Sequence, residues 1–358
     1  MRDGWVETTF GDIFKIVAGK YVAKEEYVEG GEFWIYGSNS IMGKLDRFLV
    51  EQSHVVMAAI GAYAGAVRYS KEPSWINNNA MALVPSEKIM AKYLHLWLES
   101  KFDLKRVVVG TGQPYVQRPL LLKEIISLPP LPEQKRIVDL ISSVDFYIDA
   151  LQQQLESAKR SRNAVLHELL TAGGEDWVEK TLDLVTECSW GNTETTKSKY
   201  VDSGYLAYSA SGADGFLDWF EHDRTAVVLS AIGAQCGKTW FAEGKWTSIK
   251  NTIWLKADNL NLLDKYLFYL SNRDQFWQIR GQAQPFISLG DVKKTKVLLP
   301  PIVEQERIIQ VISGLDSFQD SLTACLNSSK NLRAGILSSL LSGEHEIPAS
   351  YDKVLGAA

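Results

Sequence analysis

Apolar residues recur along two stretches of the chain with alternating spacings of four and three residues. Nine of ten such positions between 137 and 169 are apolar, as are seven of ten between 308 and 340. This spacing is typical of a coiled-coil seam and predicts two long helices. The seam residues include Ile137, Ile141, Val144, Ile148, Leu151 and Leu155 in the first stretch and Ile308, Ile312, Leu315, Leu322 and Leu326 in the second. Arg162 and Arg333 interrupt the two seams at equivalent positions.

The length of the seams predicts how the helices are used. From Glu133 to Leu170 a continuous helix is about 57 Å long, whereas a domain of the size this chain allows is only about 30–35 Å across. Because the seams are equally long, we expect the helices to pair antiparallel; the alternative is that each packs only on its own domain. Gly173 and Gly343 follow the helices, where glycine commonly ends a helix.

The helices belong to a repeat that covers nearly the whole chain. Residues 128–137 return as 299–308, 171 residues later. Trp5-Val6-Glu7 returns as Trp177-Val178-Glu179, and Gln113-Pro114-Tyr115 as Gln284-Pro285-Phe286. Two copies at so long a period are not a solenoid or a propeller. We therefore predict a duplicated protein in a pseudo-two-fold arrangement, which suits a target with two halves such as duplex DNA.

The segments outside the helices mix strand and helix patterns. Residues 55–60 and 80–84 are short apolar runs that predict buried strands, and 227–229 and 253–255 repeat them. Residues 90–98 and 266–270 have helical spacing. The predicted fold class is α+β, with two repeated mixed α/β domains joined by two long helices that form an antiparallel coiled coil.

Composition narrows the class of protein. The chain has 358 residues, 46% hydrophobic and 23% charged, which is enough for two domains with real cores. It contains neither an apolar run of membrane-spanning length nor the apolar core of a signal peptide. Cys188, Cys236 and Cys325 lack CxxC spacing and are predicted to be buried thiols in a reducing cytoplasm. Five scattered histidines form no metal-ligand pattern.

Segments of two kinds resemble motifs of catalytic proteins, but each lacks the residue types or the spacing that the motif requires. The segment 233–239 resembles a phosphate-binding loop, but three residues separate Gly233 from Gly237 where four are needed. An adenine methyltransferase needs Asn or Asp before its Pro-Pro pair and an aromatic residue after it; here leucine precedes both pairs, and leucine or isoleucine follows. Neither catalytic nor metal-binding residues are predicted.

With no catalytic motif present, the sequence favours a protein that recognises DNA through polar and aromatic side chains on its loops. Asparagine, glutamine, serine and arginine read base edges, although in glycine-rich loops they also serve as turn formers. The candidate DNA-contacting residues are Tyr36, Ser38, Asn39, Tyr63, Arg68, Gln113, Tyr115, Tyr208, Ser211, Gln235, Lys238 and Gln284. The net charge of −5, with no basic segment, predicts that the chain alone binds DNA weakly.

The repeated Leu-Pro-Pro…Glu-Gln…Arg-Ile motif, the long helix behind it and the terminal Leu-Leu resemble the specificity (S) subunits of type I restriction-modification systems. The resemblance is most specific over 128–172 and 299–343 and extends over essentially the whole chain. It implies the following segments: a first target-recognition domain, 1–128; a spacer helix, 129–172; a second recognition domain, 173–299; a second spacer helix, 300–344; and a C-terminal tail, 345–358. Val303 in place of the Pro132 counterpart, and Gln319 in the second seam, depart modestly from the repeat.

The resemblance also implies a function. In that family each recognition domain binds one half of a split DNA sequence, and the helices separate the domains and dock methyltransferase subunits. It implies a non-catalytic cytoplasmic subunit whose partners are double-stranded DNA, two methyltransferase (modification) subunits and restriction/translocase subunits. No cofactor is expected on this chain; S-adenosylmethionine, ATP and Mg²⁺ are expected on the partners. The alternatives are a stand-alone DNA methyltransferase or nuclease, and an assembly scaffold that binds no DNA.

Overall fold

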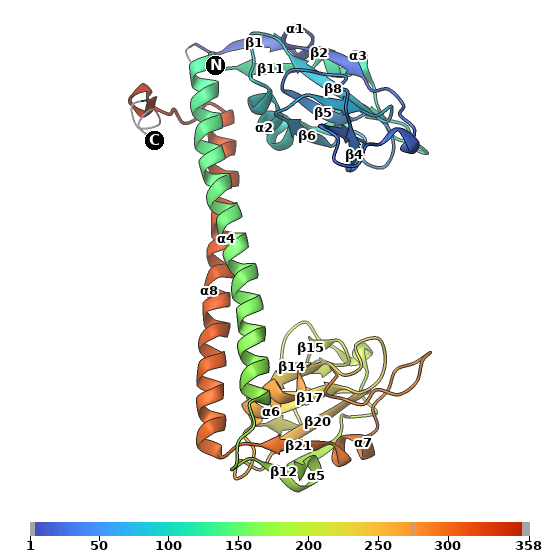
Figure 1. The fold of residues 1–358 in the computed structure, drawn as a ribbon, viewed down its shortest axis with the longest axis vertical. Helices are drawn as coiled ribbons and strands as arrows, with labels where there is room; N and C mark the ends of the chain where they lie inside the picture. The colour runs from blue at the N-terminus through green and yellow to red at the C-terminus, as the bar shows by residue number, and fades with distance from the viewer. Residues whose placement is uncertain (1–3, 274, 353–358) are drawn as a thin grey trace. The chain divides into compact units, whose positions relative to one another are not determined.

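The computed structural model describes residues 4–273 and 275–352. The chain divides into two compact units: unit 1 comprises residues 1–153 and 324–358, and unit 2 comprises residues 154–323. The two long helices, α4 (Leu131–Thr171) and α8 (Ile302–Leu341), are unbroken and close to the extents that the seams predict (Figure 1). Each unit therefore combines one mixed α/β domain with part of α4 and part of α8.

Unit 1 contains the first domain. Its strands are β1 (Val6–Thr9), β2 (Phe14–Ala18), β3 (Phe33–Tyr36), β4 (Ile41–Leu45), β5 (His54–Ala58), β6 (Val67–Ser70), β7 (Ser74–Ile76), β8 (Ala80–Pro85), β9 (Val108–Val109), β10 (Tyr115–Val116) and β11 (Ile125–Leu128). Its helices are α1 (Phe10–Ile13), α2 (Ala91–Lys101), α3 (Arg118–Lys123) and the 3₁₀ turns η1 (Lys24–Glu26), η2 (Leu104–Arg106) and η4 (Ala349–Tyr351).

Unit 2 contains the second domain. Its strands are β12 (Val178–Thr181), β13 (Thr186–Trp190), β14 (Tyr205–Ser209), β15 (Gly212–Leu217), β16 (His222–Asp223), β17 (Ala226–Ser230), β18 (Thr239–Ala242), β19 (Lys245–Ser248), β20 (Thr252–Ala257) and β21 (Lys296–Leu299). Its helices are α5 (Leu182–Val185), α6 (Asp264–Ser271), α7 (Leu289–Lys294) and the 3₁₀ turn η3 (Lys197–Lys199). The predicted mixed α/β class is confirmed for both domains.

Both domains have the same layers. A four-stranded antiparallel sheet, in the order β2-β8-β5-β6 or β13-β20-β17-β18, forms the centre. The central strands β5 and β17 are buried at every position, so both faces of the sheet are covered. The helix α2 or α6 packs on one face. A smaller sheet, β4-β3-β7 or β15-β14-β19-β16, covers the other face of the central sheet, and the two sheets share a hydrophobic cluster.

The helices run antiparallel within each unit. In unit 2 the Gln319 side chain donates to the Ala158 carbonyl of α4 at 3.3 Å, and Arg162 lies opposite Asp316. Equivalent pairings occur in unit 1, where Asp145 contacts Arg333. Most of the predicted seam residues are buried, whereas Val144 and Leu315 are half-buried. The predicted seams are thus confirmed, and Gln319 fills its seam position with a cross-helix hydrogen bond.

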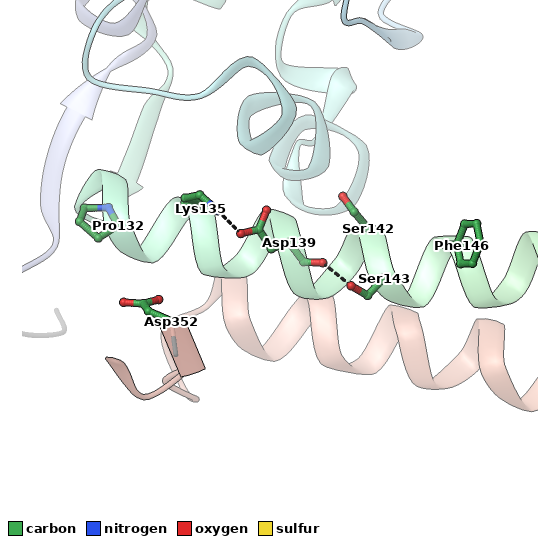
Figure 2. Close-up of a pocket in the computed structure, with 7 residues that line it drawn as sticks. All are labelled: Pro132, Lys135, Asp139, Ser142, Ser143, Phe146 and Asp352. Carbon is green, nitrogen blue, oxygen red and sulfur yellow. Dashed lines mark hydrogen bonds and ion pairs between the residues drawn. The ribbon is translucent and has the colours of Figure 1, made fainter. Parts of the chain in front are cut away.

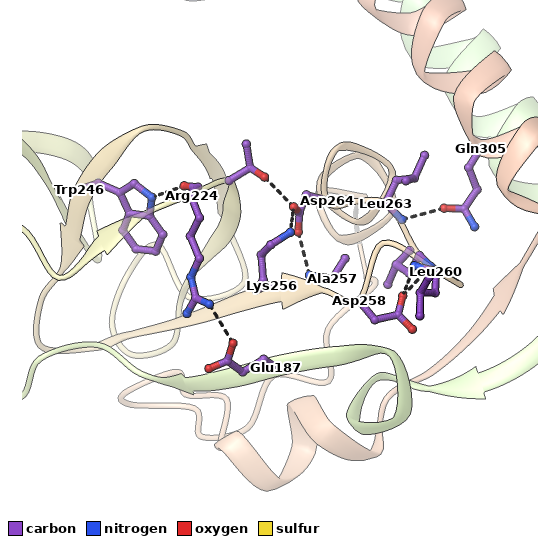
Figure 3. Close-up of polar contacts among 12 residues, drawn as sticks. Glu187, Arg224, Trp246, Lys256, Ala257, Asp258, Leu260, Leu263, Asp264 and Gln305 are labelled. Carbon is purple, nitrogen blue, oxygen red and sulfur yellow. Dashed lines mark hydrogen bonds and ion pairs between the residues drawn. The ribbon is translucent and has the colours of Figure 1, made fainter.

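The repeated Glu-Gln motif forms the joint between each domain and its helix. Gln134 and Gln305 are fully buried. The amide oxygen of Gln305 accepts from the Leu263 N–H just before α6 at 3.0 Å (Figure 3), and its NH₂ donates to the carbonyls of Asn261 and Pro300 at 2.8 and 3.0 Å. Gln134 makes the same three kinds of bond in the first domain, all at 2.9 Å.

The glutamate of the same motif binds the tryptophan that begins each domain. Trp5 donates its indole N–H to Glu133, and Trp177 donates to Glu304, both at 3.2 Å. The Trp-Val-Glu and Leu-Pro-Pro…Glu-Gln motifs therefore form the two parts of one joint in each domain. The joint lies next to the β1–β11 pair in the first domain and next to the β12–β21 pair in the second.

Replacing Gln305 with leucine is expected to lower the free energy of unfolding by about 3 kcal/mol. The substitution leaves one N–H and two carbonyls without their partner, and an unsatisfied buried polar group costs roughly 1–3 kcal/mol. Urea denaturation of the purified chain measures the change. Gln310→Leu, at an exposed position of the same helix, is the control and should change stability by less than about 0.5 kcal/mol. Equal stability of the two variants would show that the joint is not held by these bonds.

Candidate nucleic-acid interface

In the first domain, two loops lie side by side at the end of the central sheet. The Gly61 N–H donates to the Pro114 carbonyl at 2.8 Å, so the β5–β6 turn is bonded to the loop before β10. Gly61 has a φ of 97°, which favours glycine. The side chains of Tyr63 and Tyr115 are 51% and 45% exposed on these loops, and Gln113 beside them is exposed. Three of the predicted residues therefore form one polar-aromatic surface.

The second domain repeats this arrangement with different side chains. The Gly233 N–H donates to the Pro285 carbonyl at 3.0 Å. Gln235, Lys238 and Gln284 are all exposed on the paired loops. Among the residues that the structure describes, Lys238 forms no ion pair, so its ammonium group is available to an anion. Gly233 and Gly237 have φ values of 107° and 94°, which favour glycine, so the segment that resembles a phosphate-binding loop is a turn between β17 and β18.

A hairpin turn borders the loops in the first domain. Arg68, on β6, donates to the Ser38 carbonyl at 3.2 Å and to the Asn39 carbonyl. The guanidinium thus supports the β3–β4 turn, with part of its hydrogen-bonding capacity committed to backbone. Asn39 is exposed and Ser38 half-buried at this turn. These two side chains are presented by the turn, whereas Arg68 holds it in shape.

The corresponding hairpin of the second domain carries a charged cluster. Asp214, on β15, accepts from Lys197 at 2.5 Å, from Ser209 at 2.8 Å and from Tyr200 at 2.9 Å. Burial opposes ionisation of this carboxyl, but the three hydrogen bonds outweigh it and lower the pKa of Asp214. Lys197 also reaches the exposed hydroxyl of Ser211 at 3.4 Å. The cluster positions Ser211 and keeps a fixed ion pair at the turn.

This cluster could not be predicted from the sequence, because its four residues form no recognisable motif. Lys197 and Tyr200 lie on or beside η3, and the β14–β15 hairpin brings Asp214 to them. In the first domain Met42 occupies the corresponding place, so the repeat gave no signal either.

Tyr36 and Tyr208 do not belong to the exposed surface. Their side chains are only 9% and 5% exposed, and they pack in the cluster between the two sheets of each domain. The Tyr208 hydroxyl donates to the Phe241 carbonyl at 3.3 Å. The aromatic residue at the end of β3 or β14 is therefore a core residue, and we leave both tyrosines out of the interface.

The described residues hold no group of three or more His, Cys, Asp or Glu side chains that could bind a metal ion. Cys188, Cys236 and Cys325 are free thiols that are half-buried, where buried thiols were predicted. In the described part of the chain, no helix is both long and apolar enough to cross a membrane.

Comparison with known proteins agrees with a duplicated recognition protein. A match to the family described as "Type I restriction modification DNA specificity domain" covers residues 2–160 and again 174–329. A putative type I restriction enzyme specificity subunit of Haemophilus influenzae is 20% identical over 82% of both chains. A type I restriction enzyme specificity subunit of Methanocaldococcus jannaschii is 25% identical over 47% of this chain, and the match spans about half of that relative's length (46%).

Solved structures show the same fold. The S subunit of a type I restriction-modification system from M. genitalium aligns with a TM-score of 0.66 at 17% identity, covering 94% of this chain and 96% of that one. A chain from a structure on assembly and conformational transition of the type I R-M system aligns at 0.61 and 15% identity, covering 95% and 98%. With its two matched domains, its repeated joints and this fold, the chain belongs to the type I restriction-modification DNA specificity family.

Proposed function

We propose that this chain is the non-catalytic specificity subunit of a type I restriction-modification complex. Each domain reads one half of a bipartite double-stranded DNA target, and α4 and α8 set the unread gap. The observation that carries this proposal is the repeated pair of loops, which is built on the same backbone bonds in both domains but presents different polar and aromatic side chains. Such a design fits two half-sites of different sequence.

In this proposal the partner subunits, and not this chain, catalyse methyl transfer, translocation and cleavage. Two methyltransferase subunits carry S-adenosylmethionine, and restriction/translocase subunits carry ATP and Mg²⁺. The test is methylation sequencing of DNA from a host that expresses this chain with its neighbouring methyltransferase. A split motif that disappears when this chain is deleted supports the proposal. Unchanged methylation after deletion would refute it, and methylation by the isolated chain would favour a stand-alone methyltransferase.

The helices offer one docking groove for a methyltransferase in each unit. In unit 1 a groove of about 730 Å³ runs along α4 beside Phe146, whose side chain is 77% exposed, and Asp352 of the C-terminal tail borders it (Figure 2). In unit 2 a groove of about 420 Å³ is lined by α4 residues and by Phe318 of α8, which is 54% exposed. Exposed aromatic side chains beside grooves are typical anchors of protein interfaces.

Phe146→Ser and Phe318→Ser are each expected to remove one methyltransferase from the complex. Loss of a buried aromatic anchor typically costs 2 kcal/mol or more, which corresponds to a roughly 30-fold weaker affinity. Sedimentation of purified components should give two methyltransferases per wild-type chain and one per variant. Leu332→Ser, at a 62% exposed apolar position outside both grooves, is the control and should retain two. Two bound copies in both phenylalanine variants would place docking elsewhere.

A further inference from the structure

The arginine that interrupts each seam makes an ion pair across the helices. In unit 2, Arg162 of α4 donates to the two carboxylate oxygens of Asp316 on α8, at 2.8 Å from Nε and 3.5 Å from Nη2. The Arg162 side chain is only 16% exposed. A forked arginine–carboxylate contact has a narrow geometry, so it fixes where the two helices face each other.

Unit 1 contains the same ion pair at the repeated positions. Arg333 of α8 donates through Nε and Nη2 to the two oxygens of Asp145 on α4, the second bond at 3.1 Å. Arg333 and Asp316 each lie 171 residues after Arg162 and Asp145, the period of the repeat. Each helix therefore supplies the arginine of one bridge and the aspartate of the other.

Each bridge also contacts the domain of its own unit. In unit 2 the Tyr269 hydroxyl of α6 donates to Asp316 at 3.0 Å, and the Arg162 guanidinium lies 5.6 Å from the Tyr269 ring centre. In unit 1, Glu99 of α2 lies 3.9 Å from Arg333. The bridges thus join three elements each: both long helices and the helix that covers the central sheet.

Stability alone does not explain charged groups at these positions. Partly buried ion pairs lose much of their Coulombic gain to desolvation, and apolar residues of similar volume often stabilise a seam equally well. A polar group in a seam is best attested as a device that selects one register. An apolar seam of the same length would tolerate several registers and several tilts of the domain on it.

We propose that the Arg162–Asp316 bridge with Tyr269, and the Arg333–Asp145 bridge with Glu99, are sets of positioning residues. They hold each recognition domain at one angle on the helices and so restrict methylation to a single gap length. This inference rests on the proposed function, because it concerns how strictly the complex measures its target rather than which bases it reads.

The test replaces the unit 2 bridge by apolar residues of similar size, Arg162→Met with Asp316→Leu, in the complete complex. Methylation sequencing should then show unchanged half-sites, but at least a tenfold rise in the fraction of methylated sites whose gap is one base pair shorter or longer. The exchanged pair, Arg162→Asp with Asp316→Arg, keeps an ion pair across the helices but loses the acceptor of the Tyr269 hydroxyl, so its gap distribution should narrow to that of Tyr269→Phe. Tyr269→Phe removes one oxygen only and should shift the gap distribution in the same direction, which keeps the test decisive where the apolar pair prevents assembly.

The control removes an ion pair that stays within one helix. Glu156 and Lys159 on α4 form an exposed pair at 2.8 Å, so Glu156→Leu with Lys159→Met removes the same charges without touching α8, and the gap should remain single. An apolar-bridge complex that still methylates at one gap length, together with an unaltered Tyr269→Phe variant, would overturn the inference. An error in the proposed function itself would give another result, because the wild-type complex would then methylate no split motif.

Discussion

Replacing residues 1–128 with the first recognition domain of another family member is expected to change one half of the methylated motif and leave the other half unchanged. The exposed loops of the first domain, with Tyr63, Gln113 and Tyr115, would be exchanged entirely. Each mismatched base pair costs roughly 1–3 kcal/mol in specific binding. A half-site with three altered positions should therefore lose methylation at the original motif by more than about 100-fold. Methylation sequencing of the host genome gives both half-sites in one measurement.

The joint determines whether such a chimera folds. Glu133 and Gln134 stay with α4, whereas Trp5 and the backbone at Lys88 and Met90 come from the new domain. Donors should therefore be chosen with the tryptophan and the joint motif in the same places. The reciprocal replacement of residues 173–299 should change only the other half-site. A change in both halves from one replacement, or in neither, would contradict independent reading by the two domains.

The long helices could be predicted because their signal is local and periodic. The seam positions repeat every three or four residues, and glycines end both helices: Gly173 and Gly343 have φ values of 66° and 74°, as a helix-ending glycine requires. The central strands were also visible, since β5, β8, β17 and β20 are short apolar runs. Patterns that lie within a few residues of one another were sufficient for these elements.

The joints and bridges depend on contacts between distant residues. Gln134 lies in an evident motif, but nothing in the sequence indicates that its amide binds backbone 44 and 46 residues earlier. The repeat held a usable signal for the bridges: Asp145 and Asp316 recur at the same period as Arg162 and Arg333. Arginines that recur in an apolar seam, together with aspartates that recur beside it in both copies, predict pairing across the helices.

Which candidate DNA-contacting residues are exposed could be predicted only in part, because exposure depends on packing between sheets. Tyr36 is followed by Gly37, and Tyr63 lies two residues from both Gly61 and Gly65. Tyr36 is nevertheless covered by the central sheet, whereas Tyr63 is exposed on a turn. Loop composition did not separate the two cases. The same limit applies to Arg68, whose guanidinium supports a turn rather than standing free.

Lengthening the helices is expected to lengthen the unread gap without altering either half-site. Four residues inserted after Leu155 of α4 add about 6 Å and turn the helix by about 400°, roughly one full turn. In B-DNA the rise is roughly 3.4 Å per base pair, so the gap should grow by one or two base pairs. The nearly complete turn keeps the seam approximately in phase, although an insertion of four residues locally perturbs a coiled coil.

A matched insertion in α8 separates the effect of length from that perturbation. Gln319 lies opposite Ala158 and Asp316 opposite Arg162, so the position facing Leu155 on the antiparallel partner is near Leu322. Four residues inserted after both Leu155 and Leu322 lengthen the two helices together and keep their seam residues paired. The double insertion should give the longer gap with more uniform methylation than the single one, as read by long-read methylation sequencing. An active double variant that retains the original gap would show that α4 and α8 do not set the spacing, and that the domains locate their half-sites by other contacts.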